Sequence, residues 1–146
     1  MGTHDMRDTT MKLYPHLNFG GNCEEAFRFY EKLLDGRITM MMKTSELPAE
    51  VKAPPGSPDA VIHAHLTGAG IELIGNDVPQ SHFKPVRSAY VCLVVDSAEA
   101  ADRIYAGLAE GGEVSIPIAE TFFATRFAQL RDRFGALWTI IHERPR

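Results

Sequence analysis

With 146 residues the chain suits one domain, or two small modules that share a core, and its apolar content of 45% is ordinary for a globular protein. The formal net charge of −4 gives no electrostatic reason to expect nucleic acid or an anionic membrane surface as a partner. No run of about 18 apolar residues is present, so we expect no membrane-spanning helix.

The N-terminus and the cysteines indicate a compartment. Residues 1–11 are polar and lack the apolar core of a signal peptide, so we expect a disordered leader. Cys23 and Cys92 lack the spacing of a CxxC motif. Because disulfides are rare in the cytoplasm, we expect two reduced thiols in a cytoplasmic protein.

The first structured part of the sequence reads strand, helix, strand. Residues 14–19 form a short apolar strand that Gly20 and Gly21 interrupt. A capping box at residues 22–25 predicts the start of a helix, and Gly36 predicts its end. Residues 37–43 form the next strand. The apolar side chains at helical spacing are Cys23, Phe27, Tyr30 and Leu34.

A proline-rich loop follows at residues 44–59. A loop of this length inside a compact domain is typical of a lid, a binding loop or disorder. We expect it to be mobile in the free protein and to order over a bound ligand. Residues 60–67 and 70–74 then form a hairpin around Gly68-Ala69-Gly70.

The pattern then repeats. A strand at 90–95 leads to a second capping box at 96–99 and a helix that Gly111 ends. Three further strands are expected, at residues 113–118, 122–130 and 137–142. Both halves therefore read βαβββ, and self-similarity of this length indicates a duplicated unit. Two such units would pack their sheets around a ligand cup.

The last hairpin, residues 120–138, is rich in aromatic side chains and suits the wall of such a cup. Side chains alternate along a strand, which places Phe123 and Phe127 on one face and Arg126 on the other. Arg126 suits a ligand carboxylate or phosphate, or an ion pair with Glu120 or Asp132. Residues 132–135 supply the turn chemistry.

These elements and several motifs together resemble the vicinal oxygen chelate superfamily, which includes glyoxalase I, bleomycin-resistance proteins and extradiol dioxygenases. The resemblance is closest to its PhnB-like branch, whose members are often named after a ubiquinone methyltransferase. The sequence has no glycine-rich nucleotide motif after a strand, so we give that name no mechanistic weight. The motifs lie at residues 15–19, 21–26, 29–30, 63–64, 120–127 and 132–138.

The resemblance implies an α+β fold: two tandem βαβββ modules that form a cupped eight-stranded mixed sheet, the glyoxalase/bleomycin-resistance/dioxygenase fold. The resemblance covers about residues 12–142 of a single domain at residues 12–146, with module one at about 12–76 and module two at about 88–144. It also implies a homodimer, because paired modules in this superfamily are related by a two-fold axis. The implied partner is a small molecule.

Metal-dependent members of the superfamily place one ligand on the first and last strand of each module. The four positions fall here on Tyr14 or His16, on Glu72, on Tyr90 or Cys92, and on Thr139. Only Glu72 clearly retains a metal-binding side chain, and a threonine hydroxyl is a poor ligand beside a carboxylate. We therefore expect no cofactor, with a divalent metal held by His16, Glu72 and Cys92 as the fallback.

The candidate site residues carry open alternatives. Glu72 is the candidate catalytic base if its strand buries it and raises its pKa, and is otherwise an exposed carboxylate. His63 and His65 share one face of a strand and form either a ligand-binding pair or two half-exposed polar residues. Trp138 and Phe123 line a ligand or pack in the core. The full substrate-binding set is His16, Asn18, His63, His65, Tyr90, Phe123, Arg126 and Trp138.

The sequence leaves three functions open, and whether the protein is an enzyme is one of the open points. The first is a PhnB-like protein that binds a small molecule in the sheet cup without the glyoxalase-type metal. The second is a divalent-metal-dependent lyase, isomerase or dioxygenase. The third is a dimeric resistance protein that takes a bulky cationic drug between aromatic and acidic side chains.

Overall fold

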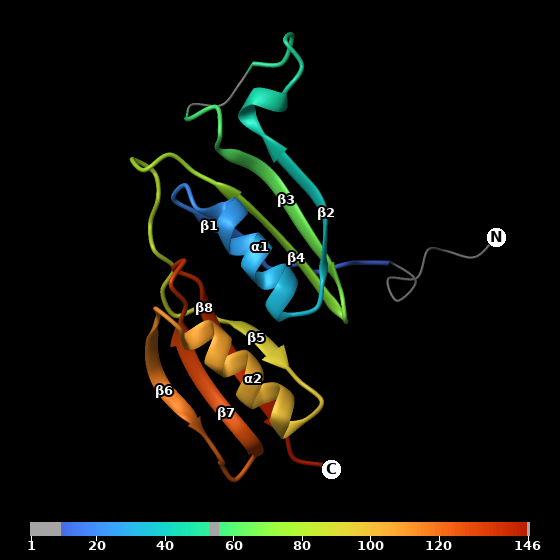
Figure 1. Cartoon of the computed structure of the whole chain (residues 1–146), viewed down its shortest axis with the longest axis vertical. Coiled ribbons are helices and arrows are strands. Elements are labelled where there is room, and N and C mark those ends of the chain that lie inside the picture. The colour runs from blue at the N-terminus through green and yellow to red at the C-terminus, as the bar shows by residue number, and fades with distance from the viewer. Residues whose placement is uncertain (1–9, 53–55, 146) are drawn as a thin grey trace, which may run out of the picture.

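The computed structural model describes residues 10–52 and 56–145. It contains two helices and eight strands in the expected βαβββ-βαβββ order, so the α+β fold is confirmed (Figure 1). No helix in these ranges is long and apolar enough to cross a membrane. The elements are β1 (His16–Phe19), α1 (Cys23–Leu33), β2 (Arg37–Lys43), the 3₁₀ turn η2 (Thr44–Glu46), β3 (Val61–Gly68), β4 (Ile71–Asp77), β5 (Val91–Val94), α2 (Ala98–Ala109), β6 (Glu113–Ala119), β7 (Ala124–Arg131) and β8 (Leu137–Glu143).

Hydrogen bonding divides the eight strands into two mixed sheets of four. The first sheet has the order β1-β4-β3-β2 and the second the order β5-β8-β7-β6, with β1 parallel to β4 and β5 parallel to β8. Both helices lie on the same side of the sheets, α1 over the first and α2 over the second (Figure 1). Each sheet therefore has one face that packs on its helix and one face that is turned away from it.

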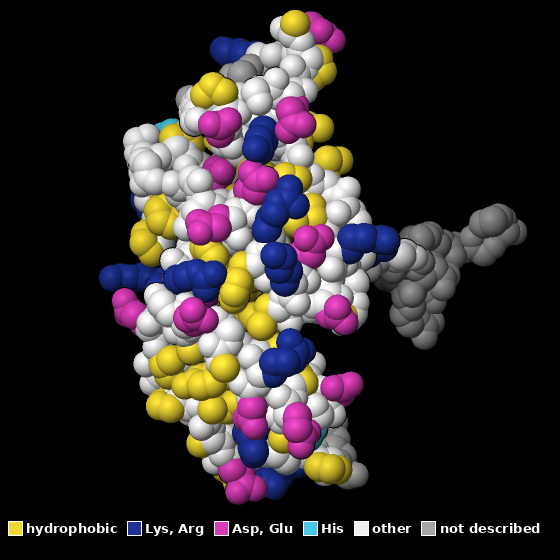
Figure 2. Space-filling model, viewed as in Figure 1, with side chains coloured by type: hydrophobic (Ala, Val, Ile, Leu, Met, Phe, Trp, Pro, Cys, Tyr) yellow, Lys and Arg dark blue, Asp and Glu magenta, His cyan; other side chains and the backbone are white. Residues whose placement is uncertain are grey.

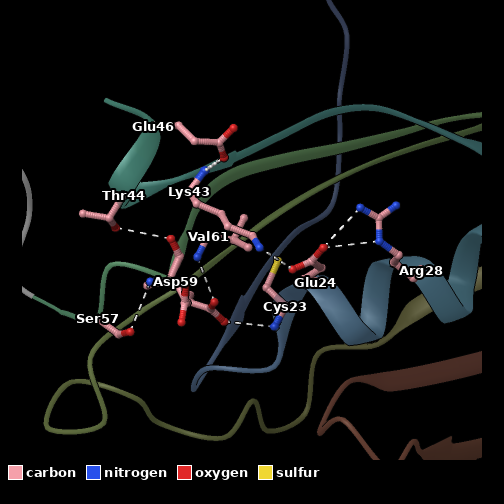
Figure 3. Close-up of polar contacts among 11 residues, drawn as sticks. Cys23, Glu24, Arg28, Lys43, Thr44, Glu46, Ser57, Asp59 and Val61 are labelled. Atoms are coloured by element: carbon pink, nitrogen blue, oxygen red, sulfur yellow. Dashed lines mark hydrogen bonds and ion pairs between the residues drawn. The ribbon is translucent and has the colours of Figure 1, made fainter. Parts of the chain in front are cut away.

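The start of α1 is capped from a distance rather than by the expected capping box. Asn22 stands at the N-cap, but its side chain makes no capping hydrogen bond. The carboxylate of Asp77 instead accepts from the backbone amides of Gly21 and Cys23, each at 3.0 Å, and from that of Val61 at 2.9 Å. Figure 3 shows the bonds from Cys23 and Val61 as dashed lines. The end of β4 thereby fixes both the helix and the start of β3.

The base of the 44–59 loop is closed by hydrogen bonds. The amide of Thr44 donates to the carbonyl of Ala60 at 2.9 Å, and the ammonium group of Lys43 lies 3.0 Å from the carboxylate of Glu24 on α1 (Figure 3). Residues 53–55 of the loop, and residues 1–9 of the expected leader, lie outside the described residues. The mobility of both segments stays a prediction.

The two modules meet at a buried carboxylate. Asp132, in the turn between β7 and β8, is 3% exposed and accepts four hydrogen bonds. Its Oδ1 accepts from the amides of Phe134 and Ala136, and its Oδ2 accepts from Trp138 Nε1 at 2.8 Å and from the Tyr30 hydroxyl on α1 at 2.5 Å. Burial, and then the charge of Asp132, raise the pKa of Tyr30 well above its usual value, so the phenol remains a donor.

Replacing Tyr30 by phenylalanine should therefore destabilise the whole chain. The substitution removes one of the two side-chain donors to a buried carboxylate, which costs about 1–3 kcal/mol of the free energy of unfolding. Urea unfolding of Tyr30→Phe measures this loss. The control is Tyr105→Phe, a half-buried tyrosine of α2. An equal loss of unfolding free energy in the two variants would show that the hydrogen bond to Asp132 adds no stability of its own.

Candidate functional site

The face of the first sheet that is turned away from α1, called here the open face, gathers polar and imidazole side chains. Ala64 and Leu66 of β3 are fully buried toward the helix, and alternation along the strand therefore turns His63 and His65 the other way. The strand registers extend this face across the sheet. It carries His16 and Asn18 of β1, Met40 and Met42 of β2, His63 and His65 of β3, and Glu72, Ile74 and Asn76 of β4.

Two of the imidazoles stand on either side of an isoleucine. In the register, His16 of β1 is opposite Ile74 of β4, and Ile74 is opposite His65 of β3. Met40 of β2 continues the row beyond His65. Two strand spacings separate the backbones of His16 and His65, a distance of about 10 Å. Ile74 is therefore an apolar centre with an imidazole ring on each side.

Glu72 fixes the orientation of His65. Its carboxylate lies 2.6 Å from His65 Nε2 and accepts from the Thr67 hydroxyl at 3.2 Å. The hydrogen bond with His65, chiefly, lowers the pKa of Glu72, so the carboxylate is ionised at neutral pH and acts only as an acceptor. His65 Nε2 is then the donor, and Nδ1 of the neutral ring is left as an acceptor.

Glu72 is thus not the buried base with a raised pKa that the sequence offered as one alternative. Its side chain is 39% exposed, and its pKa moves downward. The other alternative, an exposed carboxylate, describes its exposure better. Glu72 instead holds the imidazole of His65 through their hydrogen bond.

His16 is oriented in a similar way by Asn76. The amide nitrogen of Asn76 donates to the carbonyl of Asp77 at 3.2 Å, which turns its oxygen toward His16 Nε2. Because an amide oxygen only accepts, His16 Nε2 must donate, and its Nδ1 is the remaining acceptor. The ring of Tyr14 leans on His65 with 5.4 Å between centroids. Sequence reasoning missed Asn76 because it ended the strand at residue 74, whereas β4 continues to Asp77.

Several expected ligand-binding residues lie elsewhere. Trp138 is 1% exposed and packs on Tyr30 in the core, so it does not line a ligand site. Arg126 faces α2, where its Nε lies 2.9 Å from the carboxylate of Asp102, a partner that the sequence did not suggest. Tyr90 and Phe123 are exposed but belong to module two. The structure therefore brings together His16, Asn18, His63, His65 and Glu72 and separates them from the other four.

The donors of the fallback metal site do not converge within one chain. Residues 10–52 and 56–145 contain no group of three or more His, Cys, Asp or Glu side chains placed to hold a metal ion. His16 and Glu72 each have their own partner, and Cys92 lies on β5 of the second sheet, where burial raises the pKa of its thiol. Thr139 accepts from Gln129 Nε2 at 3.0 Å. Within the described part of one chain, these donors therefore form no common metal site.

Comparison with known proteins gives a consistent result. Residues 11–141 match the family model described as 3-demethylubiquinone-9 3-methyltransferase. Protein YjdN of Escherichia coli (strain K12) is 32% identical over 140 residues, which cover 89% of this chain and 94% of YjdN. Protein PA1353 from Pseudomonas aeruginosa, known from a crystal structure, is 32% identical with a TM-score of 0.84, and the match covers 93% of this chain and 100% of that one.

Two further structures extend the likeness. A PhnB protein from Bacillus cereus is 27% identical with a TM-score of 0.74, and the match covers 90% of this chain and 99% of that one. A glyoxylase/bleomycin resistance protein/dioxygenase domain from Frankia sp. EAN1pec is 16% identical with a TM-score of 0.62, covering 94% of this chain and 100% of that one. The second likeness is one of fold alone.

The interaction between His65 and Glu72 can be tested by titration. Replacing His65 by alanine removes the main cause of the lowered pKa of Glu72, so that pKa should rise toward its usual value. Any stability that the pair contributes is present above the ordinary glutamate pKa and is lost as the pH falls through the lowered one. Carbon-13 NMR of the Glu72 carboxyl group measures the shift. His63→Ala is the control, and an unchanged pKa in His65→Ala would contradict the assignment.

Proposed function

The chain belongs to the PhnB-like family described as 3-demethylubiquinone-9 3-methyltransferase, within the vicinal oxygen chelate superfamily, and from that premise we propose that it binds a small polar molecule on the open face of the first sheet. The observation that carries the proposal is the pair of oriented imidazoles beside Ile74. Each has its Nε2 engaged by a partner, Asn76 or Glu72, and its Nδ1 left as an acceptor.

This arrangement suits a ligand that offers hydrogen-bond donors near its two ends and an apolar middle. The donors would meet His16 and His65, and the middle would lie on Ile74, which stands between them. Binding sites of this kind combine an apolar surface with a few fixed polar groups. Any proton transfer on this face would run through His65, whose Nδ1 is an acceptor while Glu72 holds its Nε2.

A mixture of metabolites serves as the probe for this proposal. Wild-type protein is equilibrated with a metabolite extract and filtered, and the retained compounds are identified by mass spectrometry. The double variant His16→Ala/His65→Ala should bind any specific compound more weakly by about 2 kcal/mol, or roughly thirtyfold, because two hydrogen bonds are lost. His82→Ala, an exposed loop histidine, is the control.

A compound that all three proteins retain equally would place the binding site elsewhere. If no compound is retained by the wild type and lost by the double variant, the open face is likewise not the binding site. Urea unfolding of each variant separates loss of binding from loss of the fold.

We also propose that the chain forms a homodimer through the second sheet. Six of the ten large apolar side chains exposed in the described ranges belong to module two, and Val94 is 61% exposed and Phe123 44%. Val91 and Leu93 pack toward the core, so alternation along β5 turns Val94 to the face away from α2. Exposed apolar surface of this kind is typical of an interface. The second sheet also has exposed edges at β5 and β6 that another copy can cover.

Sedimentation measures this assembly directly. At micromolar concentration the wild type should be a dimer, whereas Val94→Lys should be a monomer because the interface cannot bury an unpaired ammonium group. Val51→Lys is the matched control, since Val51 is 46% exposed and lies in the 44–59 loop. A monomeric wild type, or a Val94→Lys protein that remains dimeric, would contradict the proposal.

A further inference from the structure

A second candidate site lies where the linker between β4 and β5 crosses the β7–β8 turn. A hollow of about 750 Å³ lies there, and a second hollow of about 450 Å³ adjoins it and shares Arg87 and Arg131 in its lining. In Figure 2, Lys and Arg side chains stand at the left edge of the molecule, in the region where Figure 1 shows this linker and this turn. The larger hollow is lined chiefly by Phe83, Lys84, Arg87, Arg131, Arg133 and Phe134.

Neutral groups hold two of these cations in place. The guanidinium group of Arg131 donates to the carbonyls of Gly135 and Val86, each at 2.8 Å. That of Arg133 lies over the rings of Phe29 and Phe134, 4.2 and 4.5 Å from their centroids. These partners fix the two side chains but cancel none of their charge. Both groups are therefore preorganised to receive an anion.

In the linings of the two hollows, the cations face a single carboxylate, that of Glu113 in the smaller hollow. None of the ion pairs formed among the described residues involves Lys84, Arg87, Arg131 or Arg133. Asp132 lies between two of them in the chain, but its carboxylate is buried and faces the core. The lining of the larger hollow contains no carboxylate. Four cations thus converge in a chain whose net charge is −4.

We propose that this basic hollow binds a small organic phosphate. Lys84 and Arg87 are exposed and free to close on the phosphate, while Arg131 and Arg133 are already fixed beside it. Guanidinium groups match phosphate oxygens in geometry as well as in charge. Phe83 and Phe134 offer an apolar wall for the organic part. The volume of the hollow lies in the usual range for small-molecule sites.

The smaller hollow helps to locate the phosphate. Its lining contains Glu113, whose charge repels an anion. The phosphate therefore lies in the larger hollow, on the side of Lys84 and Arg133. The residues that line the larger hollow do not belong to the open face. The proposal therefore does not depend on the function proposed for that face.

An NMR titration tests the proposal with phenyl phosphate as the probe. At low ionic strength, phenyl phosphate should shift the amide signals of residues 83–88 and 131–135 and leave those of β3 unchanged. Inorganic phosphate should bind at the same place but more weakly, because it lacks the ring, and phenol should not bind. The double variant Lys84→Ala/Arg87→Ala should weaken the binding of phenyl phosphate by roughly tenfold or more.

The matched control is Arg37→Ala/Lys52→Ala, which removes two exposed cations elsewhere and changes the net charge equally. Its affinity for phenyl phosphate should equal that of the wild type. Equal weakening in both double variants would reduce the effect to long-range charge and overturn the proposal. So would shifts confined to β3 and β4, equal binding of phenol, or the absence of binding at millimolar probe in a folded wild type.

Discussion

The buried carboxylate of Asp132 is the interaction on which the arrangement of the molecule depends. It joins the Tyr30 hydroxyl of module one to the Trp138 indole and the turn amides of module two. These donors offset the cost of burying a carboxyl group away from water. Arg131, which ends β7, and Arg133 in this turn flank Asp132, so the contact that joins the modules also positions two cations of the basic hollow. The open face of the first sheet remains turned away from both helices.

The two modules share a topology but present different chemistry. The open face of the first sheet carries imidazole, amide and carboxylate groups, whereas module two exposes Val94 on β5 and Phe123 just before β7. Duplication accounts for the common strand order. The side chains at alternate strand positions decide which chemical groups each module presents on the face turned away from its helix. One copy is suited to a polar ligand and the other to an apolar contact, and this difference favours binding by module one and assembly by module two.

Local signals allowed most of the fold to be predicted from the sequence. The start of α2 was predicted to within one residue, because Ser97, rather than the first residue of the expected capping box at 96–99, caps the helix by accepting from the amide of Ala100. The turn at residues 132–135 forms around the Asp132 carboxylate. The failures are long-range: Asp77 caps α1 from 54 residues away, and no local pattern indicates that contact. The site was only partly predictable for the same reason. Alternation placed His63 and His65 on one face, but the partner of His16 depends on a strand that extends to Asp77.

The tautomers of His16 and His65 test the central claim most directly, because the proposed site depends on both rings having Nε2 engaged and Nδ1 free. Long-range proton–nitrogen NMR spectra of the ligand-free protein distinguish the two nitrogens of each ring. The account predicts that the neutral form of both rings carries its proton on Nε2, while exposed His82 shows no such fixed preference. A proton on Nδ1 of either ring, or averaging like that of His82, would contradict it.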